Sequence, residues 1–122
     1  MKLYSILVVD DDPNMVRLIE HYLTSKEFQL TTVSSGRKAL HILASTEFDL
    51  LISDIQMPHM DGFKLAMEVR KKNSTMPLIL VSAFCDKDLI QRAKEAGANK
   101  VIQKPFERKK LRRIIKKILA ED

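Results

Sequence analysis

Residues 6–13 read ILVVDDDP, four apolar residues followed by three aspartates and a proline. The apolar run is typical of a strand that is buried on both faces of a parallel sheet. Asp12 is a favourable N-cap, and Pro13 suits the first turn of a helix. A strand that passes directly into a helix is the first half of a β-α unit, so this stretch predicts an α/β fold.

The same alternation of short apolar runs and segments of helical period continues along the whole chain. It is typical of repeated β-α units around one parallel sheet. The first, third and fourth apolar runs have few polar residues, and we therefore expect those three strands at the centre. The predicted strands are residues 5–9, 29–33, 50–53, 78–82 and 100–103. The predicted helices follow Asp12, Ser35, residue 62, Asp86 and residue 106, and the last two end at Gly97 and Leu119.

The spacing of apolar residues also predicts which side of each helix faces the core. On the third helix, this inner face is marked by Phe63, Ala66, Met67 and Arg70. On the fifth, it is marked by Leu111, Ile114, Ile115, Ile118 and Leu119. Basic side chains are expected to cover the rest of the fifth helix: Lys109, Lys110, Arg112, Arg113, Lys116 and Lys117.

Length and composition favour one globular domain that spans residues 1–122. The chain has 122 residues, of which 45% are hydrophobic and 30% charged, and this balance argues against intrinsic disorder. One cysteine and three scattered histidines make a disulfide framework or a structural zinc site improbable. No apolar run approaches the roughly 18 residues of a membrane span, and no signal peptide is recognisable. We expect a cytoplasmic protein that does not insert into membranes.

Charge is distributed unevenly between the two halves of the chain. Residues 1–61 carry 5 basic and 9 acidic side chains, whereas residues 62–122 carry 16 basic and 7 acidic ones. A basic half fits an acidic partner or nucleic acid. Because no aromatic residue interleaves the basic residues of the fifth helix to stack on bases, we favour an acidic protein surface over nucleic acid.

Polar side chains gather where the predicted strands end. Asp10 and Asp11 follow the first strand, Asp54 the third, Ser82 the fourth and Lys104 the fifth. In an open parallel sheet, ligands bind beyond the carboxyl ends of the strands, so these side chains should share one cleft. Three converging carboxylates repel one another unless a cation is present. Oxygen ligands without histidine or cysteine suit Mg²⁺, with Mn²⁺ as an alternative.

Four segments resemble the receiver domain of response regulators in two-component signalling, and most closely the chemotaxis-regulator type. They are ILVVDDDP at 6–13, DLLISDIQMPHMDG at 49–62, PLILVSA at 77–83 and KVIQKPF at 100–106. The resemblance implies a flavodoxin-like, doubly wound fold, in which a five-stranded parallel sheet of order 2-1-3-4-5 is flanked by five helices. It also implies a cis peptide bond between Lys104 and Pro105.

The resemblance further implies a role for each residue of the cleft. Asp54 would be the phosphoacceptor and a metal ligand, and Lys104 would bind the phosphoryl group. Ser82 matches the switch hydroxyl. The remaining metal ligands would be Asp11, Asp10 acting mainly through water, and the backbone carbonyl of Gln56.

The implied function is that of a phosphoacceptor signalling module. A histidine kinase or phosphotransfer protein would donate the phosphoryl group, and a partner-binding surface would then switch. The domain would catalyse only its own phosphorylation and dephosphorylation. The downstream target and the oligomeric state do not follow from the sequence.

The sequence departs from the family pattern in three respects. Val101 occupies the position of the usual aromatic switch residue, so a rotating ring is not available there. Gln56 and Phe84 occupy positions that tune loss of the phosphoryl group, and we expect Phe84 to shield the site from water. The chain ends just after the fifth predicted helix, so we expect no output domain within it.

Two other functions compete with signalling by phosphorylation. A phosphatase of the haloacid-dehalogenase type also uses a strand-end aspartate, Mg²⁺ and a lysine, but it requires a second aspartate where this chain has Gln56. A docking or nucleic-acid module that does not depend on phosphorylation is supported by the basic fifth helix and by Val101. The intact acidic residues argue against it. No GxxxxGK[ST] motif supports a P-loop enzyme.

Overall fold

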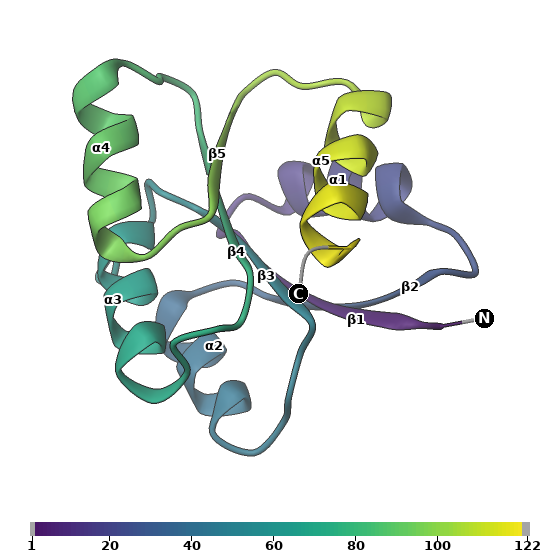
Figure 1. The fold of residues 1–122 in the computed structure, drawn as a ribbon, viewed down its shortest axis with the longest axis horizontal. Coiled ribbons are helices and arrows are strands. Elements are labelled where there is room, and N and C mark those ends of the chain that lie inside the picture. The colour runs from purple at the N-terminus through teal and green to yellow at the C-terminus, as the bar shows by residue number, and fades with distance from the viewer. Residues whose placement is uncertain (1, 121–122) are drawn as a thin grey trace.

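The computed structural model describes residues 2–120, in which five strands alternate with five helices (Figure 1). The strands are β1 (Tyr4–Val9), β2 (Phe28–Val33), β3 (Leu50–Asp54), β4 (Leu78–Ser82) and β5 (Lys100–Gln103). The helices are α1 (Pro13–Leu23), α2 (Gly36–Leu43), α3 (Gly62–Lys72), α4 (Lys87–Ala96) and α5 (Arg108–Ala120). The predicted elements are confirmed, with boundaries that shift by about one residue.

All strands are parallel, and their order in the sheet is β2-β1-β3-β4-β5. This confirms the order 2-1-3-4-5 and the central position of β1, β3 and β4. The register aligns Val9 with Ser53, and Asp54 with Val81. Because the strands end at nearly the same level, the residues that follow them meet along one edge of the sheet.

The helices form one layer on each face of the sheet (Figure 1). Helices α1 and α5 cover one face, where Ile19, Leu23, Leu111 and Ile115 pack on alternate residues of the central strands. Helices α2, α3 and α4 cover the other face, and their core includes Leu65, Val69 and Ala93. Successive side chains of a strand point to opposite faces, so the central strands are apolar on both sides.

Four helices begin with a side-chain cap that satisfies a backbone N–H of the first turn. The caps of α1, α2, α3 and α4 are Asp12, Ser35, Asp61 and Asp86, and each accepts a hydrogen bond from the backbone of the first turn. Helix α4 ends at Gly97, which has a φ of 108° in the left-handed region. These caps fix where the helices start at the carboxyl edge of the sheet.

Helix α3 buries Phe63 and Ala66, as the sequence predicts, but its inner face differs from the prediction at Met67. Its buried side includes Leu65 and Val69, whereas Met67 is 48% exposed. The prediction that Met67 marks the inner face is therefore wrong. The helix carries apolar residues around much of its circumference, and the packing against its neighbours selects Leu65 and Val69.

Helix α5 is less freely exposed than its basic composition predicts. The guanidinium of Arg112 lies over the ring of Phe28 at 5.5 Å and donates a hydrogen bond of 3.1 Å to the carbonyl of Tyr22. Lys116 pairs with Glu27 at 3.3 Å. Two of the basic side chains therefore attach α5 to the neighbouring α1 and β2 instead of projecting into solvent.

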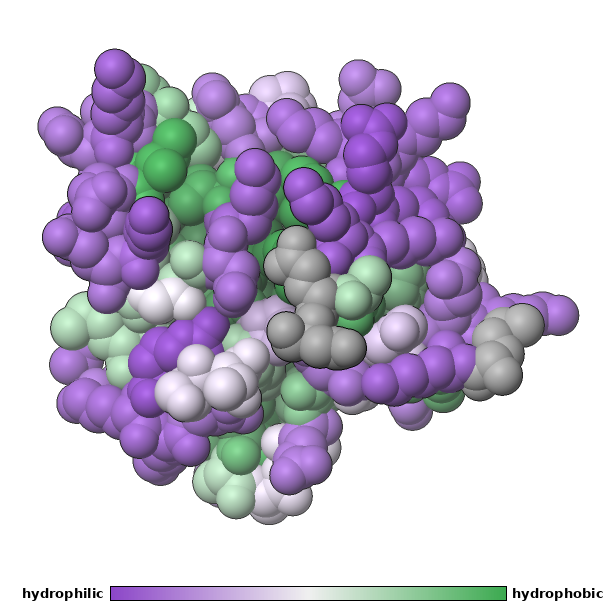
Figure 2. Space-filling view, in the orientation of Figure 1, coloured by the Kyte–Doolittle hydropathy of each residue, from purple (hydrophilic) through white to green (hydrophobic). Residues whose placement is uncertain are grey.

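In the view of Figure 2, hydrophilic side chains cover most of the surface over α5, and apolar surface shows between α4 and α5.

Val101 of β5 is half-buried against the core on the α2-α3-α4 side. Among the described helices, none is long and apolar enough to cross a membrane.

Candidate functional site

Three aspartates meet at the carboxyl edge of the sheet, at the ends of the neighbouring strands β1 and β3. Carboxylate oxygens of Asp10, Asp11 and Asp54 all lie within 4.8 Å of one another. Asp10 and Asp54 are buried, with 3% and 7% of their surfaces exposed, and Asp11 faces solvent. The structure thus brings together the three carboxylates that the sequence analysis placed in one cleft.

Burial and repulsion by neighbouring carboxylates both raise the pKa of Asp10. Its pKa is raised from the ordinary value of 3.8 to about 6, chiefly because burial disfavours the charged form. The carboxylate of Asp54 raises the pKa further, while a hydrogen bond from the backbone N–H of Asp12 and the charge of Lys104 oppose the shift. Three crowded oxygen donors with no nitrogen or sulfur ligand are a set that fits a hard divalent cation.

Lys104 reaches the acidic cluster from the end of β5. Its Nζ lies 2.8 Å from Oδ1 of Asp54, and its backbone N–H donates a hydrogen bond of 2.8 Å to the carbonyl of Ser82. The peptide bond between Lys104 and Pro105 is cis, as the resemblance implies. The lysine is therefore fixed beside Asp54 by both its backbone and its side chain.

The hydroxyl of Ser82 is directed toward its own loop. It donates a hydrogen bond of 2.7 Å to the carbonyl of Phe84 and accepts one of 3.2 Å from the backbone N–H of Phe84. The side chain of Phe84 is 64% exposed. The expectation that Phe84 shields the site is not supported, because most of the ring faces solvent.

The loop after β3 holds Gln56 and is fixed by a close backbone approach at Gly62. The N–H of Gly62 donates a hydrogen bond of 2.8 Å to the carbonyl of Ile55. A Cβ atom at Gly62 would lie 2.5 Å from the carbonyl oxygen of Asp54. Only glycine therefore permits α3 to begin directly behind Asp54. Gln56 is exposed in this loop.

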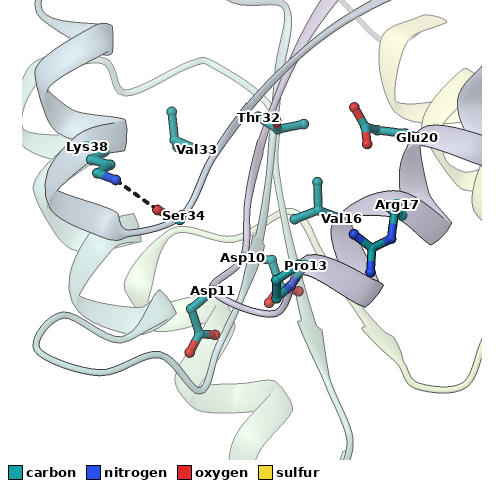
Figure 3. Close-up of a pocket in the computed structure, with 10 residues that line it drawn as sticks. All are labelled: Asp10, Asp11, Pro13, Val16, Arg17, Glu20, Thr32, Val33, Ser34 and Lys38. Carbon is teal, nitrogen blue, oxygen red and sulfur yellow. Dashed lines mark hydrogen bonds between the residues drawn. The ribbon is translucent and has the colours of Figure 1, made fainter.

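A pocket of about 450 Å³ opens beside the aspartates, between α1 and α2 (Figure 3). Arg17 of α1 and Lys38 of α2 contribute the basic side chains of its lining, and Lys38 binds Ser34 through a hydrogen bond of 3.0 Å. Neither residue is predicted from the sequence to belong to the site. A lone lysine or arginine on a helix surface carries no signal of a nearby site until the fold is known.

Comparison with known proteins agrees with this geometry. A family model for the response regulator receiver domain matches residues 6–116. Regulatory protein AtoC of Escherichia coli K12 is 33% identical over 114 residues, which cover 93% of this chain and 25% of AtoC. Sensor histidine kinase RcsC of the same strain is 38% identical over 100 residues, which cover 82% of this chain and 10% of RcsC. The chain thus spans only a quarter or less of these relatives.

Solved structures give the same result. The receiver domain of a histidine kinase from Syntrophus aciditrophicus superimposes with a TM-score of 0.87 at 34% identity, covering 96% of this chain and 90% of that one. The receiver domain of sensor histidine kinase PA1611 from Pseudomonas aeruginosa PAO1 gives a TM-score of 0.89 at 27% identity, covering 98% and 99%. That structure has a magnesium ion coordinated in its active-site cleft. The chain belongs to the response regulator receiver domain family, the phosphoacceptor signalling modules of two-component systems.

Proposed function

We propose that Asp54 is the residue of this receiver that accepts the phosphoryl group, from a histidine kinase or a phosphotransfer protein. The observation that carries the proposal is the convergence of three carboxylates with Lys104, whose Nζ lies 2.8 Å from Asp54. A structural role alone does not account for this cluster, because buried carboxylates that repel one another cost folding free energy.

The transfer uses a carboxylate oxygen of Asp54 as the nucleophile. This oxygen forms a bond to phosphorus while the bond from phosphorus to the donor breaks, and the donor keeps that electron pair. The product is an acyl phosphate. Lys104 is placed to bind an oxygen of the transferred group, and β3 and Gly62 hold the backbone of Asp54 in position. The chain needs no further acid or base for this step, because the transition state demands mainly positioning and cations.

The metal in this proposal is Mg²⁺, with Mn²⁺ as an alternative. Asp11 and Asp54 would bind it directly, Asp10 mainly through water, and Gln56 through its backbone carbonyl. The oxygen-only donor set and the raised pKa of Asp10 support a cation at this place. When bound, the metal neutralises charge on the phosphoryl oxygens.

Output is proposed to depend on Ser82. A hydroxyl that turns toward a phosphoryl oxygen must leave its two hydrogen bonds with Phe84, and the loop before α4 changes with it. Val101 cannot contribute a rotating ring. We further propose that residues 1–122 form one receiver domain, that it acts in the cytoplasm, and that its target is a protein rather than nucleic acid.

The intact mass of the protein tests this proposal directly. The chain is incubated with acetyl phosphate and Mg²⁺, and the same is done with Asp54→Asn. We expect one added phosphoryl mass on the parent, which is lost on chelation of the metal, and none on the variant. An equal phosphoryl mass on Asp54→Asn contradicts the assignment of Asp54. No phosphoryl mass on either protein favours a docking module that works without phosphorylation.

A further inference from the structure

A groove runs between α3 and α4, on the side of the molecule away from α1 and α5. It consists of two adjoining cavities of about 600 and 350 Å³, which have Asp61, Phe63 and Arg92 in common. The larger cavity extends to Ser82 and Phe84 beside the phosphorylation site, and the smaller one extends along α3 to Met67. The two helices lie next to each other along this length (Figure 1).

Each end of the groove carries an exposed apolar side chain. Phe84, at the upper end beside the phosphorylation site, is 64% exposed, and Met67, at the opposite, lower end, is 48% exposed. Among residues 2–120 only two other large apolar side chains are this exposed, Leu3 and Ile90. Phe84 lines the larger cavity and Met67 the smaller one, so a segment that lies along the groove would meet an apolar anchor at each end.

Arg92 lies between these two anchors. Its guanidinium stacks on the ring of Phe63 at 4.2 Å, which holds its plane in one orientation. Within the part of the chain that the structure describes, no carboxylate lies within ion-pair distance of Arg92. A stacked arginine with free N–H donors suits bidentate binding of a carboxylate.

The other charged groups of the groove limit what it accepts. Asp61 caps α3 by accepting a hydrogen bond from the backbone of Lys64, and the side chain of Lys64 pairs with Glu68. Glu95 lines the lower cavity. One available cation flanked by two carboxylates fits a single carboxylate of a partner, whereas a run of acidic residues would be repelled. This distinguishes the groove from the basic surface of α5.

We propose that the groove between α3 and α4 is a docking site for a protein segment that carries one carboxylate between two apolar side chains. The carboxylate binds Arg92, and the apolar side chains pack on Phe84 and Met67. The hydroxyl of Ser82 is bonded to both backbone groups of Phe84, so phosphorylation changes the upper end of the groove. Only this coupling rests on the proposed function.

The docking site is tested with a synthetic hexapeptide, acetylated and amidated, of sequence leucine-alanine-glutamate-alanine-alanine-leucine. It is titrated into the full ¹⁵N-labelled chain, with methyl signals of the methionines recorded as well. We expect saturable shifts at Phe63, Met67, Phe84 and Arg92, and binding at least about threefold weaker when glutamine replaces the glutamate of the peptide.

Two variants separate the role of Arg92 from general charge. Arg92→Lys keeps the charge but loses the planar fork, so the preference for glutamate over glutamine should become weaker than in the parent while the melting temperature holds. Arg37→Lys, an exposed residue of α2 outside the groove, should keep the preference. Equal affinity of both peptides for the parent overturns the proposal. Signal shifts on peptide addition that are confined to α5 also overturn it. So do the same shifts in the groove when only the protein concentration is raised, because they would identify a second copy of the chain as the occupant.

The coupling between phosphorylation and docking is tested by a separate measurement. The titration is repeated after phosphorylation, with the phosphoryl mass confirmed on the same sample, and we expect the affinity to change by at least about threefold, because Phe84 moves. A phosphorylated sample with unchanged affinity overturns the coupling and leaves the docking site. A sample that never gains the phosphoryl mass overturns the proposed function and the coupling with it, while the titration of the unphosphorylated chain still decides on docking.

Discussion

The two faces of the sheet are covered by helices that are attached in different ways. On one face, α1 and α5 are cross-linked by polar and aromatic contacts that involve Arg112, Tyr22 and Phe106. On the other, the elements α3 and α4 and the loop before α4 expose Met67, Phe84 and Ile90. Polar contacts thus secure α5 against α1, whereas the α3-α4 side leaves apolar side chains exposed where we propose a docking site.

The largest expected effect is on the α3 side, at Gly62. In Gly62→Ala the new Cβ meets the backbone of Asp54 and Ile55, neither of which can move without shifting β3. We expect a loss of about 3 kcal/mol or more in the free energy of unfolding, measured by urea denaturation.

Gly36→Ala provides the matched control on the same face. Its Cβ would meet only the flexible side chain of Met60, at 2.9 Å from the sulfur, and an alanine favours the helix. We expect a change within about 1 kcal/mol. Equal losses in the two variants would show that the close approach at Gly62 is not special.

The second largest effect on stability is expected at Asp10, which lies at the carboxyl edge of the sheet after β1. Because its pKa is about 6 in the folded state and near 3.8 when unfolded, the folded state binds its proton more tightly. The resulting stability is fully present below pH 3.8 and is lost as the pH rises through 6. Without metal, this residue should lower the free energy of unfolding by on the order of 1 to 3 kcal/mol over that interval.

Urea unfolding of the parent and Asp10→Asn across this pH range checks the prediction. The variant has no carboxyl to titrate, so its profile should be flatter and it should be the more stable protein at neutral pH. Parallel profiles would refute the raised pKa. Adding Mg²⁺ should raise the melting temperature of the parent at neutral pH, because it relieves the repulsion.

The third effect tests the attachment of α5. Arg112→Ala removes both the stacking on Phe28 and the hydrogen bond to Tyr22, and we expect a loss of about 1 to 2 kcal/mol in unfolding free energy. Arg113→Ala, at an exposed neighbouring position, should stay within about 0.5 kcal/mol. If the two arginines proved equivalent in thermal denaturation, the α1-α5 face would not be held by these contacts.

The smallest expected effect is at Ser82. Ser82→Ala removes two hydrogen bonds to a loop that water can reach, so we expect a loss of about 0.5 to 1 kcal/mol in stability. Amide exchange should accelerate in the loop around Phe84 and stay unchanged in α1 and α5. Faster exchange on both faces would contradict the separation drawn between them.

The sequence predicts the strands and the acidic cluster because both depend on simple geometry. Apolar runs such as residues 6–9 are buried on both faces, and parallel strands bring their carboxyl ends together. The convergence of Asp10 and Asp54 therefore follows once the strands are identified. The strand order came from the family resemblance, and the structure confirms it.

The face of α3 and the contacts of α5 do not follow in this way. Helical spacing allowed more than one apolar side for α3, and only the neighbouring helices select Leu65 and Val69 over Met67. Arg112 reaches Tyr22, which lies 90 residues earlier in the chain. Periodicity within one helix carries no information about such a distant partner.

Arg70 ties the C-terminal end of α4 to its neighbours. Its guanidinium donates hydrogen bonds to the carbonyls of Gly97 and Asn73 and to the side chain of Asn99, which in turn accepts one from the backbone of Leu78. The C-terminal end of α4 is thus tied to the end of α3 and the start of β4. Its N-terminal end follows the Ser82 loop, and within residues 2–120 no side-chain hydrogen bond links that end to another helix or strand. A rearrangement at Ser82 would therefore tilt α4 about a pivot at Gly97, so that displacement grows with distance from Arg70 along the helix.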